Sequence, residues 1–286
     1  MNAFKKTPLA LLLIATSLSS HAHNYITNKN NITTKEITFS SYNIMAARLN
    51  TLDKLSEAIN ALDADIIGLQ EVDVNTMRSA KSAPDKKPVD QAKYLSDKNK
   101  MYYKACESID FDGGKYGTAL LSKWPITSTE KIDLVNAEGR EQRSACINTI
   151  TIPGYPAPLT VIVTHPDPER DNSLRLKQVR QIMELIDKVS KNSITVLIGD
   201  LNLVPFSPEF KEISYQMNDT MPVEGNYTYP GWNPNRRIDY VLTSKAQEWE
   251  IVERKVPSPE SQWKGIDWGQ ISDHLPLIIN MRLKEM

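Results

Sequence analysis

The sequence is short of histidine and cysteine, and this scarcity excludes several kinds of catalytic centre. Only four histidines and two cysteines occur among 286 residues. His21 and His23 lie close to the N-terminus, so the rest of the chain keeps only His165 and His274. A zinc site usually draws on several closely spaced Cys or His ligands, and the sequence has no such cluster. The composition therefore argues against a zinc protein.

The two cysteines, Cys106 and Cys146, give no sign of nucleophilic catalysis, because no histidine lies near either in the sequence. An even number of cysteines in an exported protein permits a disulfide. Both residues fall within expected strands, where a buried free cysteine is a common core residue. A disulfide and two buried thiols both stay open, and we favour the two thiols.

Long apolar runs are lacking beyond the N-terminus. At the N-terminus, two lysines precede an apolar stretch from Leu9 to Leu18, and Ser20-His21-Ala22 offers a small-x-small cleavage site. This is the anatomy of a secretory signal peptide, whereas a membrane-spanning helix needs ~20 apolar residues. We expect residues 1–22 to be removed and the mature protein to be exported, either periplasmic or secreted. No cysteine follows the stretch to accept a lipid, and no later segment is apolar enough to span a bilayer.

Several sequence motifs and a strong net charge are also missing. The chain has no G-x-x-x-x-G-K-[ST] loop, no G-x-G-x-x-G turn and no G-x-S-x-G elbow, so P-loop, dinucleotide-binding and serine-hydrolase functions have no support. The net charge is −1. This gives no global attraction for a polyanion, although a local basic groove would not be visible in the total.

Residues 23–286 suit one large α/β domain, because no linker, repeat or low-complexity stretch divides them. Apolar residues at helical spacing predict helices at Leu52–Leu62, Gln91–Asp97 and Ser173–Val189. Short apolar runs predict strands at Ile37–Ile44, Asp65–Leu69, Met101–Ile109, Tyr116–Ser122, Ile126–Leu134, Ser144–Ile152, Leu159–His165, Ile194–Ile198, Ile238–Thr243 and Leu275–Met281. Helices and strands alternate early, and strands alone fill the middle. This order favours two packed mixed sheets with helices outside, an α/β (α+β) fold.

Polar residues follow several of the expected strands at the point where each one ends. They are Asn43, Glu71, His165, Asp200 and Asn202. Each alone is most simply a turn residue, but strand ends can converge on one edge of a sheet core, where a rigid site can form.

Oxygen ligands dominate this set of residues. A site of Glu71, Asp273 and the amide oxygen of Asn43 suits Mg²⁺ or Mn²⁺, with water completing the shell. His165 and His274 each lie next to a turn that also carries an aspartate, which places imidazoles near the same carboxylates.

Eight short motifs carry these residues in a fixed order: S-Y-N-I (Asn43), L-Q-E-V-D (Glu71), Y-G-T-A-L-L-S (Tyr116), E-Q-R (Arg143), V-T-H (His165), G-D-L-N (Asp200, Asn202), R-R-I-D-Y-V-L (Asp239) and I-S-D-H-L-P-L (Asp273, His274). Together they resemble the endonuclease/exonuclease/phosphatase superfamily, also called deoxyribonuclease-I-like. The resemblance implies a four-layer sandwich of two mixed β-sheets flanked by helices, and divalent-metal-dependent hydrolysis of a phosphate ester. The chain also resembles a bacterial exported branch that is similar to the C-terminal domain of the yeast calcofluor-white-hypersensitive protein, an analogy at the level of the fold.

The resemblance implies a role for each residue near the metal. Glu71 would ligate the metal, with Asn43 and Asp273 nearby, and the metal would polarise the phosphate. Asp200 would orient and deprotonate the attacking water, and Asn202 would hold that carboxylate or the phosphate.

The resemblance also implies donors to the phosphate. His274, oriented by Asp239, and His165 on the other side would contact the phosphate oxygens, with Arg143 and Tyr116 as further candidates. Simpler alternatives stay open: a solvated surface ion pair for Arg143, a packed strand residue for Tyr116, and a turn or core hydrogen bond for Asp239.

The sequence departs from the family pattern at three places without losing a proposed ligand. Pro166 follows the first histidine where Leu is frequent, and Thr118 stands where Asn or Val is common. Met45-Ala46-Ala47 occupies the position where a glycine often follows the first asparagine. The departures leave the substrate open.

Three loops would border the site: residues 75–90, 227–237 and 257–270. They carry basic and aromatic residues: Arg78, Lys81, Lys86, Lys87, Tyr227, Tyr229, Trp232, Arg236, Arg237, Trp263 and Trp268. Such residues stack on bases, contact lipid headgroups or simply pack the loops. Because no run of basic residues exceeds two, we favour a lipid or small phosphoester over a nucleic acid. We expect a monomer, and an inactive binding protein is the third alternative.

Overall fold

The computed structural model describes residues 35–169, 171, 173–222 and 224–284, so the expected signal peptide at 1–22 lies outside the described residues. The described strands form two sheets of six. In spatial order the first sheet consists of β11 (Trp249–Lys255), β12 (Leu277–Leu283), β1 (Glu36–Asn43), β2 (Ile66–Val74), β4 (Gly114–Ser122) and β3 (Tyr102–Phe111). The second consists of β5 (Ile126–Asp133), β6 (Ser144–Ile150), β7 (Leu159–Thr164), β8 (Ile194–Asp200), β10 (Asp239–Ser244) and β9 (Met217–Asp219).

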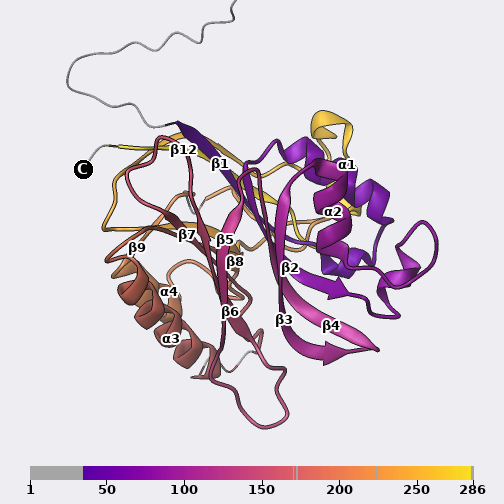
Figure 1. Ribbon diagram of the computed structural model, residues 1–286, viewed down its shortest axis with the longest axis horizontal. Helices are drawn as coiled ribbons and strands as arrows, with labels where there is room; N and C mark the ends of the chain where they lie inside the picture. Colours follow the sequence, from indigo (N-terminus) through magenta and orange to yellow (C-terminus); the bar gives the residue numbers. More distant parts are fainter. Residues whose placement is uncertain (1–34, 170, 172, 223, 285–286) are drawn as a thin grey trace, which may run out of the picture. The chain divides into compact units, whose positions relative to one another are not determined.

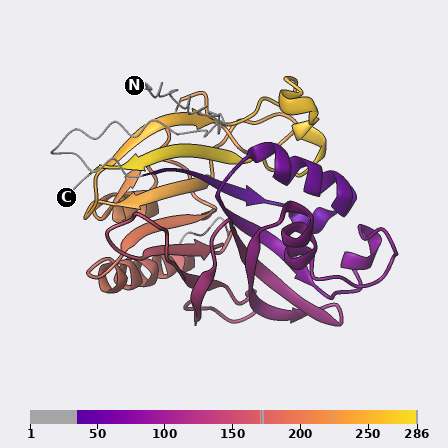
Figure 2. The same ribbon diagram turned by 45° about the horizontal axis from the view of Figure 1, so that its top comes forward.

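Both sheets are mixed, as the sequence predicts. β1 runs parallel to β2, and β7 runs parallel to β8. The other paired strands are antiparallel, including β1 with β12, which brings the C-terminal strand beside the first one (Figure 2). Asn43 at the end of β1 and Asp200 at the end of β8 therefore each lie at the end of a central strand.

Helices cover the outer face of each sheet. Figure 1 shows α1 (Leu52–Leu62) and α2 (Gln91–Asn99) on one side, and α3 (Ser173–Val189) and α4 (Pro208–Ser214) on the other. Short 3₁₀ turns occur at Met45–Ala47, Ser79–Lys81, Trp263–Gly265 and Trp268–Gln270. The order helix, sheet, sheet, helix is the four-layer sandwich that the sequence predicts, and the predicted fold class is confirmed. Within the described residues, no helix is both long enough and apolar enough to cross a membrane.

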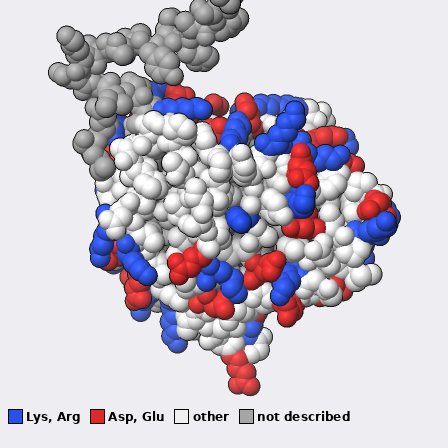
Figure 3. All heavy atoms as spheres, in the orientation of Figure 1, with Lys and Arg blue, Asp and Glu red and all other residues white. Residues whose placement is uncertain are grey.

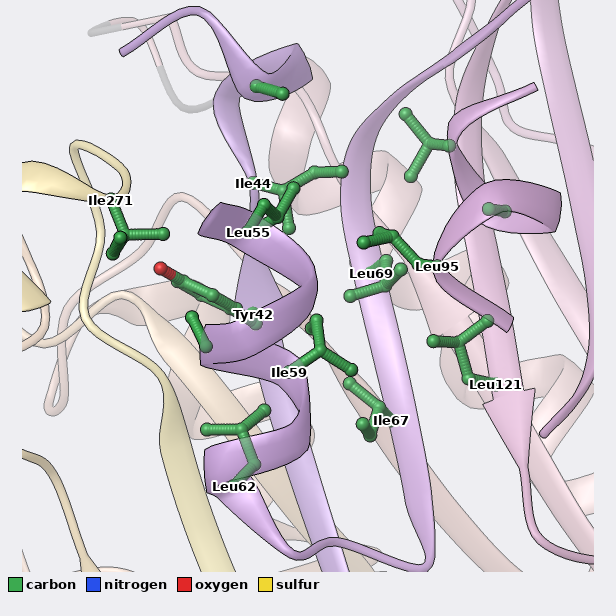
Figure 4. Packing of buried hydrophobic residues seen from close by; sticks show 14 of the residues in the cluster. Tyr42, Ile44, Leu55, Ile59, Leu62, Ile67, Leu69, Leu95, Leu121 and Ile271 are labelled. Atoms are coloured by element: carbon green, nitrogen blue, oxygen red, sulfur yellow. The ribbon is translucent and has the colours of Figure 1, made fainter. Parts of the chain in front are cut away.

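The first sheet and its helices share one apolar core. Thr51 begins α1, because its side chain accepts a hydrogen bond from the backbone N–H of Lys54. Leu55, Ile59 and Leu62 then recur on one face of the helix. In Figure 4 these side chains lie against Tyr42 of β1 and Ile67 of β2. This packing fixes the strand that ends in Asn43.

The two sheets face one another across a second core, which includes Phe39, Leu120, Val163, Ile198 and Ile279. Gly68 of β2 lies at a close approach of the sheets. A Cβ atom there would be only 2.5 Å from Cγ2 of Ile198. Glycine therefore avoids a clash with Ile198 where the sheets approach each other.

The strand that carries Glu71 is longer than the sequence predicts. β2 continues beyond Leu69 to Val74, and its register shifts between Leu69 and Val72, which marks a β-bulge. Glu71 thus lies inside the strand and not in a turn after it. The apolar pattern alone predicts that the strand ends at the first polar residue. A β-bulge is a feature of the backbone, so the apolar pattern does not reveal it.

Three other elements and one bond differ from the sequence prediction. α4 and the short β9 were not expected, and neither was β11, an edge strand of partly exposed, largely charged residues. Cys106 of β3 and Cys146 of β6 form a disulfide with Cα atoms 6.2 Å apart, so the preference for two buried thiols was wrong. These strands belong to different sheets. Which strands face each other across a sandwich is not encoded in the residues near either cysteine.

Candidate active site

Asn43 links the two sheets at the centre of the predicted site. Its side-chain Nδ2 lies 3.2 Å from Oε1 of Glu71 and 3.1 Å from Oδ2 of Asp200. Its Oδ1 accepts a hydrogen bond from the backbone N–H of Met45 at 3.0 Å, which fixes the amide nitrogen toward the two carboxylates. Asn43 therefore bridges two acids, and its role as a metal ligand stays a prediction.

Glu71 and Asp273 are two carboxylates that repel each other. Glu71 lies at the bulge of β2 with a left-handed φ of 57°, a conformation that costs energy for a non-glycine residue. Burial raises the pKa of Asp273, and the negative charge of Glu71 raises it further, against the opposing effect of His274. This corner of the site concentrates negative charge on oxygen atoms.

Asp200 is buried and surrounded by hydrogen-bond donors. Its Oδ2 lies 3.3 Å from Nε2 of His165 and 3.5 Å from Nε2 of His274. Its Oδ1 accepts the backbone N–H of Asn202 at 3.0 Å. Burial by itself raises the pKa of the Asp200 carboxyl, but the two imidazoles and that backbone N–H hold it below its ordinary value. The carboxylate is therefore ionised throughout the neutral pH range.

His274 lies between two aspartates. Nδ1 of His274 is 2.8 Å from Oδ2 of Asp239, which is fully buried at the start of β10. Burial opposes protonation of the imidazole, but Asp239 and Asp200 outweigh it and raise the pKa of His274 to about 10. Burial raises the pKa of Asp239 in turn. The arrangement is a charged imidazolium whose second nitrogen points at Asp200.

His165 is oriented by Arg143. Nη1 of Arg143 lies 3.0 Å from Nδ1 of His165. Because a guanidinium can only donate, Nδ1 accepts this bond and the proton of the neutral ring lies on Nε2, facing Asp200. Arg143 is only 9% exposed, so the alternative of a solvated surface ion pair was wrong, although Glu141 does lie 3.4 Å from its other nitrogen.

Tyr116 lies at the edge of the same centre. It lines a small pocket together with Arg143 and His165. Burial raises the pKa of Tyr116, and the charge of Glu71 adds to the effect. Its ring also packs 5.9 Å from that of Phe111, so a packing role and a site role coexist.

Asn202 joins two loops of the second sheet. Its Nδ2 donates to the carbonyl of Pro166 at 3.0 Å, and its backbone φ is left-handed at 54°. The G-D-L-N turn is thereby tied to the segment that follows His165. All ten predicted residues thus lie in one connected group, and their catalytic roles stay predictions.

Three further contacts support the site; Ser272 and Asp73 were not predicted from the sequence, and Arg78 and Tyr229 were predicted only as loop residues. The hydroxyl of Ser272 donates to the backbone carbonyl of Asn43 at 2.7 Å. Asp73 holds Arg78 by two hydrogen bonds of 2.9 and 2.7 Å. The ring of Tyr229 lies 4.8 Å from that of His274. Their positions within L-Q-E-V-D, I-S-D-H and the 227–237 loop were the signal that could have found them.

The donor set fits a hard divalent cation. Glu71 and Asp273 offer carboxylate oxygens whose mutual repulsion a cation would relieve. Asp200, Asp239 and His274 also present atoms within 4.8 Å of one another. A protonated imidazole has no lone pair for a metal, however, and the 2.8 Å contact is a hydrogen bond. Glu71 and Asp273 are therefore the better ligands.

Comparison with known proteins agrees with the geometry. The sequence profile described as "Endonuclease/Exonuclease/phosphatase family" matches residues 40–274. The chain belongs to this family. It is accordingly an enzyme of the class that hydrolyses phosphate esters, and the divalent-metal dependence of the family is consistent with its acidic site.

Solved structures of the family share the fold of this member. A Bacteroides vulgatus endonuclease/exonuclease/phosphatase is 15% identical, with a TM-score of 0.68 over 87% of this chain and 100% of that one. The catalytic domain of human Nocturnin, solved with a bound sulfate anion, is 16% identical, with a TM-score of 0.66 over 87% and 94%. A mannosyl-6-phosphatase of Bacteroides thetaiotaomicron is 17% identical, with a TM-score of 0.62 over 86% and 99%. None of the curated proteins compared with the sequence matches it. The similarity to the calcofluor-white-hypersensitive protein stays a prediction.

Proposed function

We propose that this family member is a divalent-metal-dependent phosphoesterase in which Asp200 holds the attacking water. The observation that carries the proposal is the position of Asp200, a buried carboxylate within 3.5 Å of both imidazoles. Through Asn43 it is also linked to Glu71, one of the two acids that fit a metal.

Glu71 and Asp273 would hold the metal, Mg²⁺ or Mn²⁺. When bound, it would supply positive charge that polarises the phosphate and stabilises the leaving oxygen. Asn43 positions Glu71 and Asp200 relative to each other, so the two halves of the site keep a fixed separation.

Asp200 accepts a hydrogen bond from the water and takes its proton as the water oxygen bonds to phosphorus. The ester P–O bond on the opposite side breaks, and the leaving oxygen takes a proton from solvent. The His274 cation and the Nε2–H of His165 donate to the non-bridging oxygens, where negative charge develops. Asp239 keeps His274 charged, and Arg143 keeps the His165 proton on Nε2.

A lipid or small phosphoester is the proposed substrate class. A nuclease needs a basic groove several phosphates long, whereas no run of basic residues in the sequence exceeds two. On the one face that Figure 3 shows, acidic and basic side chains intermingle. The fold neighbour named as a mannosyl-6-phosphatase supports a small phosphoester. A nuclease remains the alternative function and is an arm of the test below.

Export is part of the proposal. The N-terminal segment has the composition of a signal peptide, and the buried disulfide between the sheets suits an oxidising compartment. Fractionation of expressing cells tests this: a mature protein that begins near His23 outside the cytoplasm supports export, and full-length protein in the cytoplasm contradicts it. Size-exclusion chromatography of the same material tests the expected monomer.

The central experiment is a substrate panel with Mg²⁺, Mn²⁺ or excess chelator. Bis(4-nitrophenyl) phosphate, 4-nitrophenyl phosphate, a phosphoinositide and plasmid DNA are the substrates. We expect hydrolysis of at least one non-nucleic ester, lost in chelator and reduced at least ~100-fold by Asp200→Asn or Glu71→Gln. Asp187→Asn, which alters an exposed acid of α3, is the matched control. Activity that survives Asp200→Asn contradicts the mechanism, and cleavage of DNA at low enzyme would favour the nuclease.

A further inference from the structure

Four loops around the site expose large apolar side chains, and two of these loops also expose Val204 and Tyr227, at 41% each. Leu49, Met77, Phe206 and Trp232 have exposed fractions of 44%, 61%, 85% and 55%. Scattered apolar residues are normal on a protein surface. The four side chains indicate a common surface only if their loops lie close to the same site. The contacts of each loop place it there.

Leu49 and Trp232 flank Asp273. Arg48, next to Leu49, acts electrostatically on the Asp273 carboxyl. Gly231, next to Trp232, donates its backbone N–H to the Asp273 carbonyl at 2.6 Å. Two loops far apart in the sequence, each with an exposed apolar side chain, therefore lie next to the same residue, Asp273.

The loop of Met77 comes close to Glu71 through Arg78, the next residue. Its neighbour Arg78 is fixed by Asp73 at 2.7 Å. The pKa of Arg78 is raised, chiefly by Asp73, and Glu71 contributes too. The backbone N–H of Met77 donates to the carbonyl of Asp112 at 2.8 Å, which holds the segment against the β3–β4 turn.

Phe206 protrudes from the turn that follows Asp200 and Asn202. Leu203 anchors this turn, because it is buried and its carbonyl accepts the Tyr240 hydroxyl at 3.0 Å. Phe206 has a φ of 69°, which is strained for a bulky side chain, and it is the most exposed large apolar residue of the described chain. Strain combined with exposure four residues from a site asparagine points to function.

Cations accompany these apolar tips. Arg48 adjoins Leu49, Arg78 adjoins Met77, and the exposed Arg236 lies in the loop of Trp232. Apolar tips interspersed with Arg are typical of surfaces that enter a lipid interface. Base stacking does not explain the set, because Leu49 and Met77 offer no aromatic face. The four side chains are exposed on separate loops, whereas a small soluble ligand requires an enclosed apolar pocket.

We propose that Leu49, Met77, Phe206 and Trp232 form an interfacial rim that enters a lipid surface, and that the substrate is the phosphoester headgroup of a lipid. This inference rests on the proposed function. The rim would bring Glu71, Asp200 and Asp273 to the level of the headgroups, where the phosphate lies.

Sedimentation with vesicles tests the rim without relying on activity. The probe is phosphatidylcholine vesicles with about one third phosphatidylglycerol, chosen because the nearby Arg side chains favour anionic lipid. The rim variant is Leu49→Ser/Met77→Ser/Phe206→Ser/Trp232→Ser, and we expect its partition coefficient to fall roughly 100-fold, with Phe206→Ser alone near 10-fold. The matched control is Tyr102→Ser/Tyr215→Ser/Val252→Ser, which removes three exposed apolar side chains from other elements. It should partition as the wild type does.

The outcomes separate this inference from the proposed function. Each protein is also assayed on bis(4-nitrophenyl) phosphate, a soluble ester. A wild type that hydrolyses this ester but does not bind vesicles overturns the rim and leaves the phosphoesterase standing. Equal loss of binding in the rim and control variants overturns it as well. A wild type that binds vesicles but hydrolyses no ester of the panel overturns the proposed function and, with it, the lipid substrate.

Discussion

Removal of the Cys106–Cys146 disulfide should destabilise the protein by an amount that follows from its place in the chain. The two residues are 40 positions apart, and the bond joins β3 of one sheet to β6 of the other. In the chain-entropy treatment, a cross-link that closes a loop of this length lowers the entropy of the unfolded chain by about 13 cal/mol/K. At room temperature this corresponds to about 4 kcal/mol, a large part of the stability of an ordinary domain.

Urea denaturation of the oxidised wild type, the reduced wild type and Cys106→Ala/Cys146→Ala measures the effect. We expect the reduced wild type and the double variant to lose similar free energies of unfolding, and the double variant to be insensitive to reductant. Thiol titration of the unfolded oxidised protein should find no free cysteine. A difference below about 1 kcal/mol between oxidised and reduced wild type would refute the chain-entropy reasoning.

Three further predictions concern stability. The folded pKa of His274 is about 10, against 6.5 in the unfolded chain, so its stabilisation is complete below pH 6.5 and is lost as pH rises through 10. In chelator, His274→Gln should remove about 5 kcal/mol of this alkaline decline in the free energy of unfolding, measured by urea titrations. Lys100 ends α2 with a left-handed φ of 54°, so Lys100→Gly should raise the unfolding free energy by about 0.5–1 kcal/mol, whereas Lys98→Gly inside the helix should lower it. Gly68→Ala should lower the free energy of unfolding by about 2 kcal/mol, because the added methyl group clashes with Ile198. Ile198→Ala relieves this clash, so it should lower the free energy of unfolding less in the Gly68→Ala variant than in the wild type.

The parts of the fold that sequence predicts well are those in which the side-chain pattern is the cause of the structure. The bounds of the helices at Leu52–Leu62 and Ser173–Val189 agree with the structure, because their apolar faces repeat at helical spacing and pack on a sheet. Buried strands such as β8 are apolar runs for the same reason. Asn43, His165 and Asp200 could be selected because they interrupt these patterns at strand ends, whereas Glu71 lies within β2.

What the sequence left open depends on contacts between distant segments. The direction of the Asn43 amide follows from a backbone N–H and two carboxylates that come from both sheets. The disulfide depends on which strands face each other across the sandwich. Arg143 is compatible with a surface ion pair until the fold buries it against His165. None of these contacts is a property of the local sequence.

Part of the backbone strain of the described chain lies in the site and explains why so many partners fix it. Met45, Ala46 and Ala47 have φ values of 49°, 49° and 53°, directly after Ile44, and Glu71 and Asn202 are left-handed too. At roughly 1–2 kcal/mol for each non-glycine residue, five such residues oppose folding by an amount comparable to the net stability of a domain. The Asn43 bridge, the Asn202 bonds and the apolar cores must therefore offset this strain. Because this strain leaves the folded state little free energy to spare, the cross-link between the sheets is important for keeping the site in place. We therefore expect reduction of the disulfide to lower activity as well as stability.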